Sequence, residues 1–107
     1  MRIVAIAMLL GAQLAAADAP ACKQEVAEAH IKTAVAAYTN GEFAKAFTEF
    51  DAAYTCKADS GVAAKAFMSA CRAKLDKSAK VYWGRVDASR RDQLVQICLT
   101  EGIDPRK

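Results

Sequence analysis

The stretch NGEFAKAFTEFDAAY, residues 40–54, decides the fold of this chain. It carries four aromatic rings at helical spacing, namely Phe43, Phe47, Phe50 and Tyr54. At about 100° per residue these rings occupy a wedge of about 60°, and the small side chains of Ala46 and Ala53 lie along one edge of that wedge. Rings beside alanines are typical of a helix packed tightly between neighbours, because the rings fill space while the alanines allow close approach. We therefore interpret the stripe as core rather than as an exposed surface for stacking a ligand.

The first residues have the layout of a secretory signal peptide. Arg2 gives a short basic start, residues 3–10 are an uninterrupted apolar run, and a small-residue zone precedes Pro20. We expect cleavage after Ala17, which leaves a signal peptide at 1–17 and a single domain at 18–107. No other segment approaches the ~20 apolar residues that a membrane-spanning helix needs. The sequence therefore predicts an exported protein, periplasmic or extracellular, with no transmembrane segment.

Composition limits the class of the mature domain. About 90 residues suffice for one domain. The formal charge of the chain is +3, and it falls by one to +2 when Arg2 leaves with the signal peptide. Lysines and arginines are interspersed with acids rather than clustered, which argues against a nucleic-acid partner. Alanine is abundant, the chain has only two prolines and five glycines, and no segment shows strand-type alternation, so we expect an all-α fold.

Helical periodicity accounts for nearly everything after Cys22 and predicts five helices. We expect Asn40-Gly41 to end the first helix, Asp59 or Ser60 to cap the third and Asp76 to cap the fourth. Ser89 opens a capping box before the fifth helix, which Gly102 ends, so that Ile103 packs back and residues 104–107 form a frayed tail. Loops this short require consecutive helices to be antiparallel. The expected helices cover residues 24–39, 42–57, 62–74, 77–85 and 89–101.

The chain also shows a partial internal repeat. The motif formed by a small residue, an aromatic ring and a second small residue recurs at a shift of 79 − 46 = 33 positions. A period in the low thirties with one helix pair per unit resembles the tetratricopeptide repeat (TPR), in a short exported bacterial form. In the first unit Gly41 stands at the turn and Phe43 at the following aromatic position, whereas the second unit has Lys74 in place of the turn glycine. The two copies of the motif are Ala46, Phe50 and Ala53, and Ala79, Trp83 and Val86.

This resemblance implies two TPR-like helical hairpins followed by a C-terminal capping helix. It also implies a protein-binding or scaffolding role, because TPR proteins generally present the first helices of their pairs to a peptide or partner domain. Cations and apolar side chains on that surface suit an acidic or amphipathic segment of another protein. We expect the partner-binding residues to be Lys32, Val35, Tyr38, Thr39, Lys65, Met68 and Arg72.

The four cysteines predict two disulfide bonds, since an even count in a short exported chain indicates a disulfide framework. With alternating helix directions, Cys22 and Cys56 lie at one end of the stack, and Cys71 and Cys98 lie near the other. Ends separated by about ten helical residues are roughly 15 Å apart, whereas a disulfide needs Cα atoms within about 7 Å. The expected bonds are Cys22–Cys56 and Cys71–Cys98. An alternative for Cys22 is a lipid-modified N-terminus, although residues 19–21 lack the leucine usual before such a cysteine.

No catalytic constellation is visible in the sequence. There is no nucleophile elbow or phosphate-binding glycine loop, and the single histidine, His30, lies within a helix without nominated partners. We expect no enzymatic activity, no cofactor and no metal site, and we interpret His30 as a partly buried helical residue. The alternative function is that of a small secreted helical carrier of an apolar ligand, whose cavity the rings of Phe43, Phe47, Phe50, Phe67 and Trp83 would line.

Overall fold

The computed structural model describes residues 22–107 and is all-helical, as expected. The signal peptide predicted at 1–17 lies outside the described residues. Within residues 22–107 there is no strand, and no helix is long and apolar enough to cross a membrane. The helices are α2 (Gln24–Thr39), α3 (Phe43–Cys56), α4 (Ser60–Arg72), α5 (Asp76–Trp83) and α6 (Ala88–Thr100). All five expected helices are present, and their ends differ from the expected ones by at most two residues.

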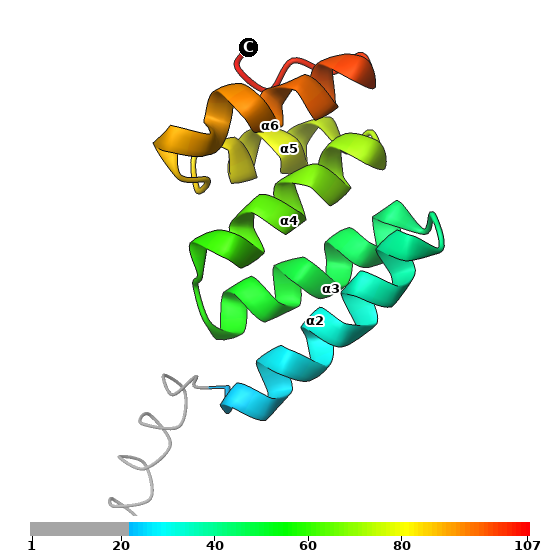
Figure 1. Cartoon of the computed structure of the whole chain (residues 1–107), viewed down its shortest axis with the longest axis vertical. Coiled ribbons are helices and arrows are strands. Elements are labelled where there is room, and N and C mark those ends of the chain that lie inside the picture. Colours follow the sequence, from blue (N-terminus) through cyan, green and yellow to red (C-terminus); the bar gives the residue numbers. More distant parts are fainter. Residues whose placement is uncertain (1–21) are drawn as a thin grey trace, which may run out of the picture.

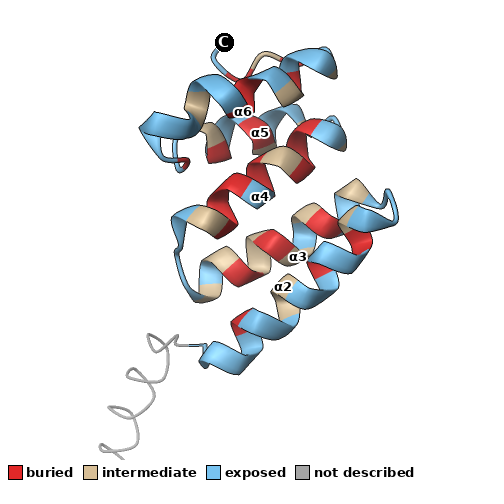
Figure 2. Cartoon of the chain, viewed as in Figure 1, coloured by how far each residue is buried: buried red, intermediate tan, exposed pale blue. Residues whose placement is uncertain are grey.

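The helices form a stack in chain order, with α2 at one end and α6 at the other (Figure 1). α2 packs on α3, α3 packs on α4, and α4 contacts both α5 and α6. The central position of α4 explains why it has more buried residues than any other helix of the stack (Figure 2). Its fully enclosed ring, Phe67, and the neighbouring Ala63 and Ala70 have no exposed surface.

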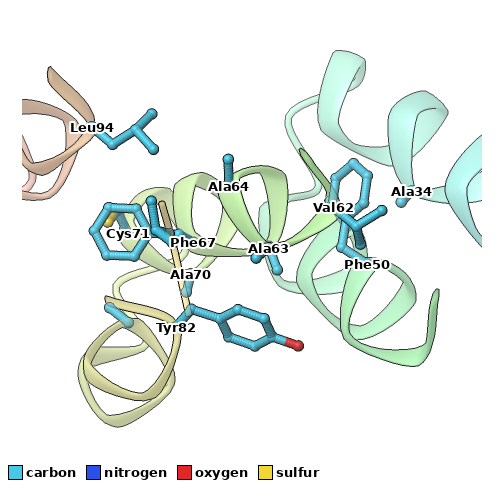
Figure 3. Packing of buried hydrophobic residues seen from close by; sticks show 14 of the residues in the cluster. Ala34, Phe50, Val62, Ala63, Ala64, Phe67, Ala70, Cys71, Tyr82 and Leu94 are labelled. Carbon is cyan, nitrogen blue, oxygen red and sulfur yellow. The ribbon is translucent and has the colours of Figure 1, made fainter. Parts of the chain in front are cut away.

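Most of the stripe of residues 40–54 belongs to the core, as predicted, but Phe43 is half-buried and lies outside the core cluster. Ala46, Phe50 and Ala53 are buried, and Phe47 and Tyr54 pack against them from half-buried positions. Figure 3 shows the Phe50 ring in the same region as Val62 of α4 and Ala34 of α2. One ring that the repeat did not indicate, Tyr82 of α5, is only 1% exposed and is the largest fully buried side chain. The expected counterpart, Trp83, is only half-buried.

The two turns at the ends of α2 and α4 have the same backbone hydrogen bonds, 33 positions apart. Gly41 N–H donates to the Tyr38 carbonyl (3.0 Å) and Glu42 N–H to the Ala37 carbonyl (2.8 Å). Their counterparts are Lys74 N–H to Cys71 (3.0 Å) and Leu75 N–H to Ala70 (2.9 Å). This pattern closes a helix through a left-handed residue, and φ is accordingly 80° at Gly41 and 59° at Lys74. The backbone therefore repeats at a position where the sequence does not.

Two of the expected helix caps are wrong. Asp59 does cap α4, since its carboxylate accepts from Val62 N–H at 3.1 Å. Asp76, however, is the first residue of α5 rather than its cap, because the preceding turn places Leu75 at the helix start, where its carbonyl accepts from Ala79 N–H. Ser89 likewise lies inside α6, whose cap residue is Asp87 and which has no side-chain capping bond.

Both predicted disulfides are present. Cys22–Cys56 joins the start of α2 to the end of α3 with Cα atoms 4.9 Å apart, and Cys71–Cys98 joins α4 to α6 with Cα atoms 4.5 Å apart. Because disulfides persist in oxidising surroundings, the two bonds indicate an environment other than the cytoplasm. A lipid on the Cys22 thiol is incompatible with the first bond.

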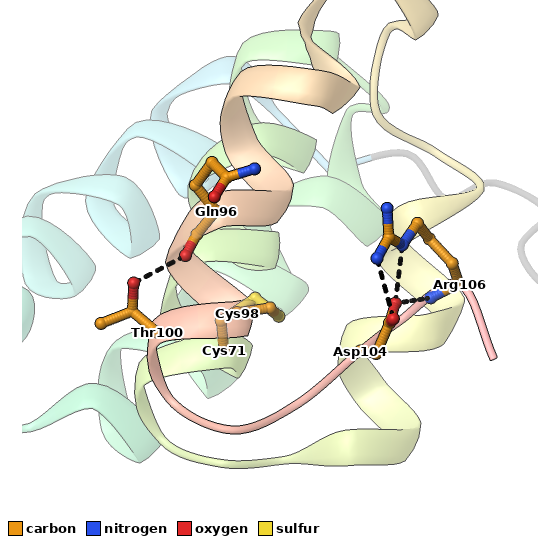
Figure 4. The surroundings of a disulfide bond; sticks show 6 residues. All are labelled: Cys71, Gln96, Cys98, Thr100, Asp104 and Arg106. Carbon is orange, nitrogen blue, oxygen red and sulfur yellow. Dashed lines mark hydrogen bonds and ion pairs between the residues drawn. A yellow bond between two sulfur atoms is a disulfide. The ribbon is translucent and has the colours of Figure 1, made fainter.

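The expected frayed tail is wrong, because residues after α6 fold back beside the second disulfide (Figure 4). Gly102 ends α6 with φ 85°, and Ile103 and Pro105 are both buried. Arg106 donates from Nε and Nη2 to the two carboxylate oxygens of Asp104 at 2.8 and 2.9 Å. These hydrogen bonds lower the pKa of the Asp104 carboxyl to about 2.

Candidate functional site

Five of the seven residues expected to bind a partner line one hollow between α2 and α4. Val35, Tyr38 and Thr39 come from α2, Lys65 and Met68 from α4, and Phe50 of α3 lies at the bottom. The hollow has a volume of about 160 Å³. An apolar cavity of about 150 Å³ holds a benzene molecule, so this first hollow has room for one apolar side chain.

Helical spacing brings these side chains to the same face. Tyr38 and Thr39 follow Val35 by three and four residues, and Met68 follows Lys65 by three. Each set therefore forms one ridge on its helix. Val35 is 45% exposed, although it is apolar. Phe50 is only 2% exposed and forms part of the core as well as of the hollow. The first hollow is therefore an open apolar depression over a firmly packed floor.

The other two expected residues, Lys32 and Arg72, do not line the first hollow. Lys32 is exposed on α2, one helical turn before Val35. Arg72 ends α4, and its guanidinium carbon lies 5.8 Å from the centre of the Tyr38 ring and 5.7 Å from that of Phe43. A guanidinium within about 6 Å of an aromatic face is attracted by it, which holds Arg72 beside Tyr38 at the edge of the hollow.

A second hollow, which the sequence did not indicate, lies one helical turn closer to the N-terminal ends of the same two helices. Its volume is about 210 Å³. Ile31 of α2 and Val62 of α4 belong to it, four residues before Val35 and three before Lys65, and Ala53 of α3 replaces Phe50 at its floor. We call the two hollows together the α2–α4 groove. The second hollow is lined by Gln24, Ala27, Glu28, Ile31, Ala53, Lys57, Asp59 and Val62.

Charge differs between the two ends of the α2–α4 groove. α4 contains no acidic residue, and α2 contains none after Glu28. Lys65 is the charged side chain that lines the first hollow, and the cations Lys32 and Arg72 lie on the same two helices. None of these three forms an ion pair within residues 22–107. The second hollow carries both signs, with Glu28 and Asp59 near Lys57. The cations of α2 and α4 therefore favour an anionic group at the first hollow more than at the second.

The rings that a carrier would use are packed against other rings. Phe47 meets the Tyr82 ring edge-on with centres 5.6 Å apart, and Phe67 lies 5.7 Å from Trp83. Phe43 meets Tyr38 edge-on at 5.0 Å. Of the five rings, only Phe50 contributes to the α2–α4 groove.

Two pairs of titratable groups join different helices. His30 Nδ1 lies 2.7 Å from Glu49 Oε1, and His30 is partly buried, with a side chain 35% exposed. The Tyr82 hydroxyl donates to Asp51 Oδ1 at 2.6 Å. The pKa of Tyr82 is raised well above its ordinary value, mainly by burial and secondly by this hydrogen bond. Residues 22–107 contain no group of three or more His, Cys, Asp or Glu side chains placed to hold a metal ion.

Comparisons with protein-family models, with curated proteins and with solved structures gave no match.

Proposed function

We propose that this protein is a non-catalytic protein-binding or scaffolding module that acts in the cell envelope or outside the cell. In this proposal, α2–α3 and α4–α5 are two antiparallel TPR-like hairpins, and α6 covers the end of the stack. The repeated turn at Gly41 and Lys74, with its hydrogen bonds 33 positions apart, supports two equivalent units. Export by the N-terminal segment is consistent with the oxidising environment that the disulfides indicate.

The observation that carries the proposal is the first hollow. Five residues nominated from the sequence surround it, and they come from the first helices of the two hairpins. Exposed apolar surface at Val35 beside a hollow of side-chain size is typical of an interaction site. The packing of Phe47 and Phe67 against neighbouring rings favours this function over a carrier with an internal ligand cavity.

In this proposal the partner is an acidic, amphipathic protein segment, which suits the apolar lining of the first hollow and the cations of α2 and α4. One apolar side chain of that segment occupies the first hollow against Phe50. An aspartate or glutamate beside it faces Lys65 and Arg72, which have no ion-pair partner within residues 22–107. Groups of opposite charge contribute specificity and faster association here, while the apolar side chain contributes most of the affinity.

The test uses two valines on opposite faces of the same helix. Val35 and Val26 are 45% and 42% exposed, and nine residues at about 100° each place them about 180° apart. Peptides are first selected from a displayed random library for binding to the oxidised protein. Their affinities for the unmodified protein, for Val35→Asp and for Val26→Asp are then compared. We expect the selected peptides to combine an acidic and a large apolar residue. Val35→Asp should weaken binding by roughly tenfold or more, which is about 1.4 kcal/mol, whereas Val26→Asp leaves it unchanged. Equal affinities for both variants would refute the proposed site.

The proposed export has its own measurement. Mass spectrometry of the mature N-terminus should give a chain that begins at Asp18. A start at Met1 would contradict export through a cleaved signal peptide.

A further inference from the structure

The two disulfides differ in how far solvent can reach them. Cys71 and Cys98 both have no exposed surface, whereas Cys22 is exposed and Cys56 is half-buried. Reduction of a disulfide requires a thiolate to approach one of its sulfur atoms directly. In the folded chain only Cys22–Cys56 is open to that approach.

The first half of α2, residues 24–31, has little buried surface apart from the disulfide. α2 has three buried residues, Ala27, Ala34 and Ala37, all of them small. Only Ala27 lies in the first half, where the half-buried Ile31 also packs against the core. Two side-chain interactions also hold this half of the helix. Lys57 Nζ donates to Gln24 Oε1 at 3.0 Å on the exposed surface, and His30 pairs with Glu49. The second half is secured differently, by the turn at Gly41 and the contact between Tyr38 and Phe43.

We propose that Cys22–Cys56 is a reducible cross-link that holds the first half of α2 in place and thereby controls the second hollow of the α2–α4 groove. Gln24, Ala27 and Ile31, which line the second hollow, lie in this half of the helix. The first hollow, lined by Val35 and Tyr38, remains in place when the cross-link opens. The consequence for partner binding rests on the proposed function, but the release of the helix does not.

The reaction is thiol–disulfide exchange with a dithiol reductant. A thiolate of the reductant attacks Sγ of Cys22, which is the more exposed of the two residues, forms a mixed disulfide there and expels the Cys56 thiolate, which takes up a proton. The second thiol of the reductant attacks the mixed disulfide, releases Cys22 and closes the oxidised ring of the reductant. Two electrons and two protons pass from the dithiol to the two cysteines.

The test measures reduction and helix release separately, and neither measurement needs a partner. The oxidised protein is treated with graded dithiothreitol, quenched with iodoacetamide and mapped by mass spectrometry. We expect Cys22 and Cys56 to be alkylated roughly tenfold or more faster than Cys71 and Cys98, because of their exposure. Equal rates, or earlier opening of Cys71–Cys98, would overturn the proposal.

Hydrogen exchange on the singly reduced protein gives the second measurement. The amides of residues 28–34 donate to the carbonyls of residues 24–30 in the first half of α2. They should therefore exchange roughly tenfold or more faster than in the oxidised protein, while those of α4 keep their protection. Unchanged exchange at residues 28–34 would show that the cross-link does not hold the helix. Loss of protection in α4 would show that it stabilises the whole domain, which also contradicts the proposal.

Paired variants provide a check without reductant. Cys22→Ser with Cys56→Ser should reproduce the fast exchange of residues 28–34 in an otherwise folded protein, whereas Cys71→Ser with Cys98→Ser should lower protection in α4 and α6 together. A selected peptide that reaches the second hollow should bind the first pair of variants roughly tenfold or more weakly than the oxidised protein. If peptide selection yields no binder, the proposed function fails while the exchange measurements still decide the role of the cross-link.

Discussion

The repeated turn at Gly41 and Lys74 can be tested by two substitutions that should change the free energy of unfolding in opposite directions. Both residues have positive φ, 80° and 59°. This conformation costs an ordinary L-residue about 1–2 kcal/mol, and glycine is free of that cost. A Cβ added at Gly41 would have no atom within 4 Å, so Gly41→Ala meets a conformational penalty without a steric one. Alanine also restricts the unfolded chain, which returns about 0.4–1 kcal/mol. We therefore expect Gly41→Ala to lower the free energy of unfolding by about 1 kcal/mol.

Lys74→Gly should act in the opposite direction. It removes the same backbone penalty and adds the unfolded-state entropy of glycine, about 0.5–1 kcal/mol, so a net gain of about 0.5–1 kcal/mol remains. Lys74→Ala removes the charge but keeps the penalty, and it should change stability by less than about 0.5 kcal/mol. This comparison separates the backbone effect from the loss of the lysine side chain.

Gly84→Ala is the matched control for Gly41→Ala. Gly84 has an ordinary helical φ of −75°, and a Cβ there would meet the Val81 carbonyl oxygen at 3.6 Å, a normal contact distance. Alanine at this position should raise stability by about 0.4–1 kcal/mol, because it restricts only the unfolded chain.

Urea denaturation under oxidising conditions, followed by far-ultraviolet circular dichroism, measures all four variants. A change of about 1 kcal/mol corresponds to about 4–8 °C in Tm for a domain of this size. The reasoning is refuted if Gly41→Ala and Gly84→Ala change stability alike, or if Lys74→Gly is less stable than the unmodified protein.

Three further variants test the core, a partly buried hydrogen bond and the second disulfide. Phe67→Ala removes a ring with no exposed surface and should lower the free energy of unfolding in urea by about 3–5 kcal/mol. Tyr82→Phe leaves Asp51 without its hydroxyl donor and should cost about 1–2 kcal/mol at neutral pH. Since the folded state raises the pKa of Tyr82, this group's contribution is complete below its unfolded pKa of about 10 and declines as pH rises above it. The stability difference between Tyr82→Phe and the unmodified protein should therefore shrink in alkaline urea titrations, and a constant difference would contradict this account. Replacing Cys71 and Cys98 together by alanine opens a cross-link with a sequence separation of 27 and should lower the urea-derived stability by about 3–4 kcal/mol; a loss below about 1 kcal/mol would show that the bond adds little to packing.

The helices and the cysteine pairs were predictable from the sequence because their signals are local or follow from chain direction. Apolar residues recur at helical spacing from Gln24 onward, and α2 has the expected bounds. The disulfide pairs required only that helix directions alternate, which places Cys22 and Cys56 at one end. Helix starts were less predictable: several polar side chains compete near Asp76 and Ser89, and the preceding turns decide which backbone carbonyl receives the first hydrogen bond.

The first hollow was predictable in part. The ridges of α2 and α4 follow from spacing, and the resemblance to the tetratricopeptide repeat predicted that Val35 and Met68 share one surface. The floor was not predictable, because the sequence indicates only that Phe50 is a core residue. The packing of α3 beneath both helices brings Phe50 to the hollow. The second hollow depends on the same arrangement, and no residue type in its lining distinguishes it from an ordinary helix surface.

The sequence by itself determined which segments are helical and which face of each is apolar, since these properties depend on residues three and four positions apart. It also determined the core role of the stripe in residues 40–54. Only the tertiary structure decided that Lys74 takes the left-handed conformation, because Leu75 must return its N–H to Ala70 for α5 to pack on α4. Only it decided that Tyr82 rather than Trp83 is enclosed, because Asp51 lies opposite and accepts a hydrogen bond from the Tyr82 hydroxyl. The choice of Tyr82 depends on a group 31 residues away, whose position exists only after the helices have packed.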